Sequence, residues 1–531
     1  MNRTQKVRLD IIVDFLTIVW FLLSAITWFN YKSNVANIEF VNRLVVVFLY
    51  FVCRVGLIKN TKSIELSFLL VLFFLYIYEL SLGYLQLFKV IPSNDLNMLT
   101  IGSFSNSGPY GSFIAICDVV FTVYYYENHN KKHSVVFIIA SILGFILLPS
   151  IRSRTAILSL ITGLCIYFGL TNKNKIYKSL PYILMVLMIF GISAYFYKKN
   201  SAQGRIFMSK INIQALFECG FTGKGLGSYS GVYGNQQFCY FYNKMNGRLD
   251  ESLLNERERM VADCPNVSFN DFLGIGIESG IITMVVYITI IACSLHIALR
   301  KKSVWSYGLI AYSMFALFYY PSKLLLFNLL FPILLAFCVS SKRGNNKTII
   351  YYSIPVSLLS LFLMIYLYPI NKNYNKSIST WSSRTSRQYS LGKYEKVIEG
   401  CDTLEKTLNS YPPFMFAYGR TLNILGDYQK SDSILLIGAE YSSDPMFWNI
   451  MGNNSLALGN YREAENRYMH AFFMVPNRLY PLYLLAKLYY IEGDTTRFLI
   501  MADKVESFIP KVESTKTEKL RTEISVLKDN L

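Results

Sequence analysis

The sequence is poor in residues that bind metal ions, and those it has are scattered. Its 531 residues include four histidines and nine cysteines. The histidines are His129, His133, His296 and His470. The spacing of the histidines and cysteines matches no zinc-binding pattern, and the cysteines do not form the framework of a disulfide-rich domain. We therefore expect no metal centre and no cofactor.

Charged residues are also scarce. Only 16% of the residues are charged and 53% are hydrophobic, with 38 Phe and 40 Tyr. This composition excludes a water-soluble fold for the N-terminal two thirds of the chain. The formal net charge is +18, but Lys and Arg lie in short clusters between apolar runs. That pattern is typical of membrane topology signals and not of nucleic-acid binding, so we expect no nucleic-acid partner.

Apolar runs of about twenty residues, the length that crosses a bilayer, recur along the N-terminal part of the chain. The candidate spans are Ile11–Trp28, Val41–Leu57, Glu65–Phe88, Gly108–Tyr126, Ser134–Leu148, Thr155–Leu170, Leu180–Tyr197, Asn270–Leu299, Val304–Tyr319, Lys323–Val339 and Ile349–Tyr368, about eleven in all. The run from Asn270 is long, and we expect it to begin as an interfacial helix outside the membrane. The sequence thus predicts an all-α fold, a polytopic membrane bundle over residues 1–370 with a large polar loop at 198–269.

The basic clusters predict the orientation of this bundle, because Lys and Arg are in excess on the cytoplasmic side of membrane proteins. Clusters on alternate connections are Arg3, Lys6 and Arg8; Lys59 and Lys62; Lys131 and Lys132; Lys173, Lys175 and Lys178; Arg300, Lys301 and Lys302; and Lys342, Arg343 and Lys347. We expect a bacterial inner-membrane protein with a cytoplasmic N-terminus, a periplasmic loop 198–269 and a periplasmic C-terminal domain. The first span lacks the cleavage pattern of a signal peptide.

The C-terminal part is polar and repetitive. Residues 371–388 are predicted to form a linker. Glycines then recur at spacings of 34, 33 and 34 residues, as Gly392, Gly426, Gly459 and Gly493. This period, with Tyr two positions after the first three glycines, resembles the tetratricopeptide repeat of paired helices. Residues 389–531 are therefore expected to form a periplasmic α-solenoid, a surface that more often binds a protein partner than performs chemistry.

Three cysteines, Cys219, Cys239 and Cys264, lie in the polar loop. In an oxidising periplasm two of them can form a disulfide and leave one thiol over; the alternative is that all three remain thiols.

Arginines near the outer face can bind an anion. Arg152 and Arg154 lie in a turn between two apolar runs, and Arg205 opens the polar loop. A guanidinium group binds phosphate through two parallel hydrogen bonds and keeps its proton, so these residues suit a lipid diphosphate. The alternative is that they extend to phospholipid headgroups.

Two further patterns border the loop. The run Gly220–Ser228 fits no Walker motif and is expected to be a tight turn that allows close backbone approach. Asn270, Gly274 and Glu278 are spaced i, i+4 and i+8, so they fall on one face of a helix. Such a face can admit a sugar or a headgroup, or pack closely on another helix.

Five short motifs, taken in order, resemble those of the O-antigen ligase and polymerase superfamily. They are Gly102-Ser-Phe-Ser-Asn-Ser-Gly-Pro109, Ser153-Arg-Thr155, Gly204-Arg-Ile206, Gly223-Lys-Gly-Leu-Gly227 and Asn270-Asp-Phe-Leu273 with Glu278-Ser-Gly280. The architecture of residues 1–339 is similar as well, and members with C-terminal tetratricopeptide repeats are familiar.

The resemblance implies transfer or polymerisation of a glycan from an undecaprenyl-diphosphate donor to a lipid, glycan or protein acceptor, without a metal or nucleotide. Charge grows on the departing diphosphate, and fixed arginines stabilise it. We therefore expect Arg154 and Arg205 to be catalytic. Residues expected to bind substrate are Arg152, Asn106, Lys224 and Asn270.

One position departs from the family pattern. Where the ligases have histidine before the asparagine, this chain has Phe269. Asp271, Asp263 or Glu278 would then serve as the base that activates the acceptor hydroxyl. The departure favours a polymerase or a protein O-oligosaccharyltransferase over a lipid A-core ligase. Two other classes stay open: a membrane transporter, and a scaffold that acts through its repeats.

Overall fold

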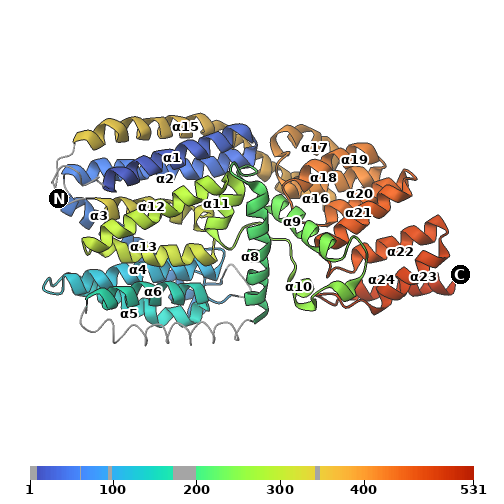
Figure 1. Ribbon diagram of the computed structural model, residues 1–531, viewed down its shortest axis with the longest axis horizontal. Helices are drawn as coiled ribbons and strands as arrows, with labels where there is room; N and C mark the ends of the chain where they lie inside the picture. The colour runs from blue at the N-terminus through green and yellow to red at the C-terminus, as the bar shows by residue number, and fades with distance from the viewer. Residues whose placement is uncertain (1–8, 60, 94–97, 172–198, 341–346) are drawn as a thin grey trace.

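The computed structural model describes residues 9–59, 61–93, 98–171, 199–340 and 347–531. Within these ranges every regular element is a helix (Figure 1), which confirms the predicted all-α class. The predicted span Leu180–Tyr197 lies outside the described residues.

One half of the molecule is a bundle of apolar helices that lie side by side (Figure 1). They are α1 (Leu9–Asn30), α2 (Asn34–Lys59), α3 (Thr61–Leu87), α4 (Ser107–Glu127), α5 (Ser134–Ile151), α6 (Arg154–Thr171), α11 (Asp271–Ser279), α12 (Ile281–Arg300), α13 (Val304–Phe318), α14 (Leu325–Val339) and α15 (Lys347–Thr380). Seven of the described helices are long and apolar enough to cross a membrane, and α13 and α14 are shorter apolar helices.

Helix α4 lies in the core of this bundle, packed against α5, α6 and α13. Every residue from Ser107 to Val123 is buried. The surrounding helices instead point large apolar side chains outward: Phe15 is 62% exposed, Phe74 68% and Phe362 64%. Exposing this much apolar surface to water costs free energy, whereas lipid solvates it well. The bundle therefore has the surface expected of a membrane protein.

The long run that begins at Asn270 is broken at Gly280. Its backbone has φ of +91°, which favours glycine, and a Cβ atom there would collide with the carbonyl of Phe221. The run therefore forms two helices, the short α11 and the apolar α12. Helix α11 lies at the end of the bundle, as Figure 1 shows.

The polar loop is largely helical. Its elements are α8 (Lys199–Cys219), α9 (Tyr229–Lys244), the 3₁₀ helix η1 (Glu251–Leu253) and α10 (Glu256–Val261). Helix α8 runs across the end of the bundle, nearly at right angles to its helices (Figure 1). Helices α9 and α10 lie between α8 and the C-terminal half. The loop is thus a layer between the two halves of the molecule.

The C-terminal half consists of helices that pack on their neighbours in chain order. They are α17 (Tyr394–Leu408), α18 (Pro412–Leu425), α19 (Tyr428–Ala439), α20 (Met446–Ala457), α21 (Tyr461–Met474), α22 (Tyr480–Glu492), α23 (Thr495–Ser507) and α24 (Thr515–Asp529). Gly392, Gly426, Gly459 and Gly493 all have positive φ. Each stands just before α17, α19, α21 or α23, so the period of the sequence equals one pair of helices.

The stretch expected to be a linker is helical. Helix α15 continues from the bundle to Thr380, and the π-helical turn η3 (Trp381–Thr385) and α16 (Ser386–Ser390) follow it without a break. Residues 371–388 therefore form a helical connection to the C-terminal half.

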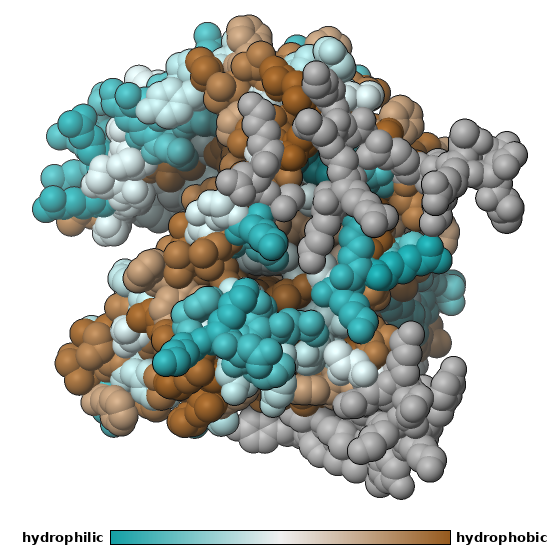
Figure 2. Space-filling model, turned by 90° about the vertical axis from the view of Figure 1, so that its left-hand side faces the viewer, coloured by the Kyte–Doolittle hydropathy of each residue, from teal (hydrophilic) through white to brown (hydrophobic). Residues whose placement is uncertain are grey.

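Direct contacts hold the C-terminal half against the middle layer and the bundle. Gln237 Nε2 on α9 donates to the Met474 carbonyl at 2.6 Å, and the hydroxyl oxygens of Ser230 and Ser443 are 3.1 Å apart. Asn34 Nδ2, at the start of α2, donates to the Thr407 carbonyl at 2.7 Å. Figure 2 shows the opposite end of the bundle, where hydrophilic residues gather in the middle and hydrophobic residues lie mainly at the lower left and at the top.

Candidate functional site

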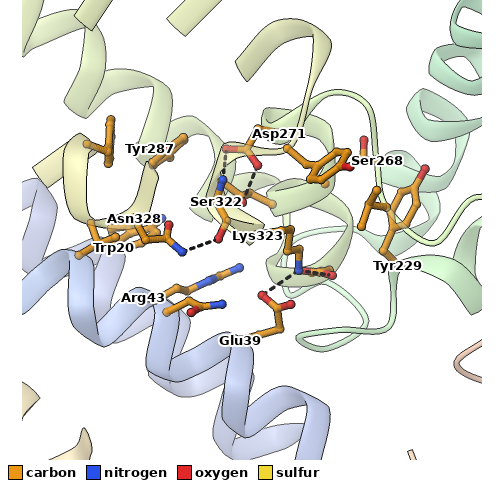
Figure 3. Close-up of a pocket in the computed structure, with 18 of the residues that line it drawn as sticks. Trp20, Glu39, Arg43, Tyr229, Ser268, Asp271, Tyr287, Ser322, Lys323 and Asn328 are labelled. Atoms are coloured by element: carbon orange, nitrogen blue, oxygen red, sulfur yellow. Dashed lines mark hydrogen bonds and ion pairs between the residues drawn. The ribbon is translucent and has the colours of Figure 1, made fainter. Parts of the chain in front are cut away.

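A narrow cavity lined by charged side chains lies where α2, α11 and the start of α14 meet (Figure 3). Its free space is about 30 Å³. That space holds a few water molecules or one hydroxyl group.

Three charged residues from distant parts of the sequence form an ion cluster in this cavity, in which Glu278 is buried and Lys323 and Glu39 are partly buried. Lys323 Nζ lies 2.8 Å from Oε2 of Glu278 and 3.0 Å from Oε2 of Glu39. Lys323 belongs to the 3₁₀ turn η2 (Pro321–Lys323), Glu278 to the last turn of α11, and Glu39 to α2. The cluster therefore ties three elements together at the end of the bundle.

Arg43 supplies a second cation. It lies one turn after Glu39 on α2, and its side chain extends toward Ser322 and Lys323 (Figure 3). Its Nη1 donates to Ser24 Oγ at 2.9 Å, and its Cζ lies 5.7 Å from the centre of the Trp20 ring. Arg43 is thus held in place from α1 while its charge faces the cavity.

Asp271 begins α11 and is buried, with 3% of its surface exposed. Its carboxylate accepts hydrogen bonds from the Ser322 hydroxyl at 2.5 Å and the Ser322 backbone N–H at 3.4 Å. Burial raises the pKa of Asp271 to about 7, although Ser322 and the charge of Lys323 act in the opposite direction. Its carboxyl group therefore exchanges a proton near neutral pH, as a general base requires.

The charge balance of the cavity fits this proton exchange. With Asp271 protonated, Arg43 and Lys323 balance Glu39 and Glu278. Ionised Asp271 adds one unpaired negative charge to a site shielded from water, which is costly. A proton on Asp271 restores neutrality.

The glycine run holds α11 from its C-terminal end. The backbone N–H groups of Lys224 and Gly225 donate to the carbonyls of Ile277 and Glu278 at 3.1 and 2.9 Å. Gly223 has φ of +74°, and a Cβ atom there would lie 2.5 Å from the Glu278 carbonyl oxygen. The expectation of a tight turn with close backbone approach is confirmed, and the run satisfies carbonyls that the helix end leaves open.

The two predicted arginines lie near each other beside α8. Arg205 Nη1 donates to the Phe318 carbonyl at 3.2 Å, and Arg154 Nη2 donates to Ser201 Oγ at 3.2 Å. Burial lowers the pKa of Arg205, and the positive charge of Arg154 lowers it further. Two cations that influence each other in this way can together bind an anion with more than one negative charge.

Phe269, the residue before Asn270, contacts Arg205. The guanidinium carbon lies 4.9 Å from the centre of the Phe269 ring and 5.4 Å from that of Tyr319. Phe269 also meets Tyr320 edge to face at 5.6 Å, and Tyr320 lines the charged cavity. These rings connect the arginine pair to the cavity that contains Asp271.

The four residues predicted to bind substrate have different surroundings. Asn106 caps α4 and also accepts a hydrogen bond from the Tyr319 hydroxyl at 3.0 Å, so it lies beside the arginine pair. Asn270 caps α11 by accepting from the Leu273 N–H at 3.0 Å. Arg152 is an exposed residue in the left-handed conformation at the end of α5. The exposed side chain of Lys224 borders a second cavity, on the far side of the glycine run.

Asp263, the third candidate base, lies elsewhere. It accepts a hydrogen bond from Lys511 Nζ at 2.8 Å, and this cation lowers the pKa of Asp263 against the effect of burial. Asp263 therefore stays ionised and links the middle layer to the C-terminal half. This geometry leaves Asp271 and Glu278 beside the cavity, and Glu278 is already paired with Lys323.

All nine cysteines fall within the described ranges and are free thiols, so no disulfide forms in the loop. Cys264 Sγ instead lies 3.4 Å from Arg478 Nη2. Within the described residues, no group of three or more His, Cys, Asp or Glu side chains is arranged to hold a metal ion.

The sequence patterns did not single out four residues of this site, which are Glu39, Arg43, Ser322 and Lys323. Two features of the sequence could have identified them. Glu39 and Arg43 are opposite charges at i and i+4 at the start of an apolar run, and charges at such places are functional candidates by default. The stretch Tyr319-Tyr-Pro-Ser-Lys323 breaks two apolar runs with hydrogen-bonding groups.

Comparisons with protein-family models and with curated proteins find no match for this chain.

Proposed function

We propose that this protein is a membrane glycosyltransferase that moves or polymerises a glycan. The donor is an undecaprenyl-diphosphate-linked sugar, and the acceptor is a hydroxyl group at the periplasmic face of a bacterial inner membrane. The observation that carries this proposal is the pairing of Arg154 and Arg205 beside a cavity in which the pKa of the buried Asp271 is about 7. The order of the family-like motifs supports the same activity.

The arginine pair binds the diphosphate of the donor. Arg154 begins α6 and Arg205 lies on α8, the helix that crosses the end of the bundle, where lipid headgroups meet water. Their fixed charges stabilise the negative charge that grows on the diphosphate as its bond to the sugar breaks. Phe269 and Tyr319 pack against Arg205 and hold its guanidinium group in place.

Asp271 activates the acceptor. Its ionised carboxylate removes the proton of the acceptor hydroxyl, and the hydroxyl oxygen attacks the anomeric carbon of the donor sugar. The bond between that carbon and the diphosphate oxygen breaks, and the diphosphate departs with the electron pair. Ser322 orients the carboxylate, and Arg43 and Lys323 favour its ionised form.

The proposed topology places this site outside the cell. We propose about eleven spans, with the basic clusters in the cytoplasm and both α8 and the C-terminal half in the periplasm. The hydrophilic end of the bundle in Figure 2 supports a water-facing surface opposite α8. We further propose that the C-terminal helix pairs form a solenoid of the tetratricopeptide type that binds a partner or an acceptor.

The arrangement suits a ligase, a polymerase or a protein O-oligosaccharyltransferase, which differ only in their acceptor. A deletion strain of the producing bacterium distinguishes them. Lipopolysaccharide, free surface polysaccharide and glycoproteins are compared by gel electrophoresis and sugar analysis. One of these products should disappear while lipid-linked donor accumulates; unchanged products in all three fractions would overturn the proposal.

A further inference from the structure

A second and larger cavity lies between the bundle and the C-terminal half. Its volume is about 690 Å³, within the range of small-molecule sites. The walls come from the turn between α1 and α2, the glycine run, α9, and helices α19 to α21. Residues 200 positions or more apart thus enclose one space.

The walls are held together by close backbone contacts. Gly231 of α9 packs directly on the Glu440 carbonyl, where a Cβ atom would collide. Tyr31 Oη donates to the Gly223 carbonyl at 3.3 Å, and the Ser230–Ser443 contact closes the same side. The cavity therefore exists only where the bundle and the C-terminal half are in contact.

Amide side chains without a protein partner line this cavity. Gln236 is 94% buried, since only 6% of its surface is exposed, and within the described residues its side chain makes no hydrogen bond. Asn30 and Asn235 also have unbonded side chains among these residues. The amide atoms of these three residues are accessible from the cavity, and a ligand hydroxyl group, which both donates and accepts, can form hydrogen bonds with them.

An aromatic stack forms another part of the wall. The His470 ring lies between Trp448 at 3.6 Å and Phe238 at 3.8 Å, centre to centre, and both pairs are stacked. Burial lowers the pKa of His470 to about 3, so this stack is uncharged. Trp448 lines the cavity, and the face of an indole ring packs well against the C–H groups of a sugar ring.

The charges on the wall are balanced. Lys32 and Lys224 provide two cations, and Glu218 and Glu440 two anions. A polyanion or polycation gains little from such a lining. Amides, an aromatic face and balanced charge together fit a ligand rich in hydroxyl groups.

The glycine run separates this cavity from the charged one. Lys224, Gly225 and Ser228 line the larger cavity, while the Gly225 N–H bonds the carbonyl of Glu278, whose side chain lies in the smaller one. The two cavities therefore share one wall, which the glycine run forms.

We propose that the larger cavity binds the carbohydrate chain of the acceptor. This inference rests on the proposed function, because it assigns the acceptor of that reaction as a glycan. The smaller cavity holds the carboxylate that activates the acceptor, and the larger cavity holds further sugars of the same chain on the other side of the glycine run.

The test measures binding of oligosaccharides to the full-length protein in lipid nanodiscs. The probe is the oligosaccharide mixture released by mild acid from the surface polysaccharide of the producing bacterium, detected by saturation-transfer NMR. Asn235→Trp fills the cavity from an exposed position on α9, and Gln236→Leu removes the buried amide at similar volume. Gln429→Trp adds the same ring on the outside of α19 as a control.

The oligosaccharides should bind with equal affinity to the wild-type protein, Gln429→Trp and Arg205→Ala. They should bind at least about tenfold more weakly to the two cavity variants. No binding by wild type, equal binding by the cavity variants, or binding of acceptor peptides in place of sugars would overturn the inference. Glycan transfer, assayed in parallel, separates the two proposals. If the cavity variants transfer glycan normally, the acceptor site is wrong and the proposed function stands. If the wild-type protein binds sugars in this cavity but transfers no glycan, the proposed function is wrong and the sugar site stands.

Discussion

The Ser322 hydroxyl donates a hydrogen bond to the carboxylate of Asp271 across 2.5 Å. The two residues are 51 positions apart, at the start of α11 and in the turn before α14. This bond fixes the carboxylate at the wall of a cavity that also contains two cations and two carboxylates. Its consequences for proton transfer can be measured.

Activity should depend on the ionisation of Asp271. Since the pKa of its carboxyl group is about 7, glycan transfer should rise as the pH increases through about 7. Asp271→Asn should lower the rate by roughly 10²–10⁴-fold and remove this limb of the pH profile. Ser322→Ala should keep the limb but move its midpoint upward, because it removes a bond that favours the anion. An unchanged pH profile in Asp271→Asn would exclude Asp271 as the base.

The same carboxyl should make the fold less stable as the pH rises. The unfolded chain loses this proton near pH 4, with the usual pKa of about 3.9 for Asp, and the folded protein holds it to about pH 7. Between these values the folded state binds more protons, so its stability falls with increasing pH. Asp271→Asn should flatten the change of melting temperature between pH 5 and 8 relative to wild type.

Removing only the cation of the ion cluster should lower the stability of the fold more than removing the cation together with one of its carboxylates. Lys323→Met leaves the buried Glu278 and the partly buried Glu39 without their cation and should cost about 3 kcal/mol. Adding Glu278→Gln to Lys323→Met should recover part of that loss, as measured by thermal unfolding in detergent. Arg467→Met, which removes a partly buried cation from the C-terminal half, is the control. Equal melting temperatures for the single and double variants would show that the pair does not couple.

The glycine run should tolerate no side chain at its contact with α11. Gly223→Ala combines a positive φ with a collision against the Glu278 backbone, and it should lower the melting temperature and glycan transfer together. Gly204→Ala is the matched control, since a Cβ atom there meets nothing within 4 Å. Within the helix α8 it should be neutral or stabilise by up to about 1 kcal/mol. Comparable losses in both variants would contradict this role of Gly223.

Phe269 should act through Arg205. A ring over a guanidinium group contributes about 0.5–2 kcal/mol, so Phe269→Leu should raise the KM for the lipid-linked donor by about two- to thirtyfold with little change in kcat. Phe217→Leu removes an exposed ring from α8 and should change neither constant. A fall in kcat alone would assign Phe269 a different role.

Several parts of this structure were predictable from local sequence patterns. Apolar runs located the helices of the bundle, the 34-residue period located the C-terminal helix pairs, and positive-φ glycines gave the turn before α9. The helical form of residues 371–388 and of α8 was not predictable from apolar periodicity. Their helical form depends on tertiary packing, as the buried Tyr374 and Ser377 show for residues 371–388.

The charged cavity was harder to predict because its members come from three distant segments. Glu39, Glu278 and Lys323 look like separate polar residues in the sequence, and only the fold brings them within 3.0 Å. The contact between Phe269 and Arg205 was not predictable either, because the two residues lie 64 positions apart and only the fold brings the ring and the guanidinium group together.

The most direct test of the central claim is glycan transfer by the purified protein in nanodiscs. The donor is the undecaprenyl-diphosphate-linked glycan extracted from a deletion strain, and release of undecaprenyl diphosphate is followed by mass spectrometry. Wild type and Arg300→Ala, an exposed change at the far end of α12, should release it at equal rates. Arg154→Ala and Arg205→Ala should each be slower by about 10²–10³-fold. Wild-type rates in both arginine variants, or no release by the wild-type protein, would contradict the account.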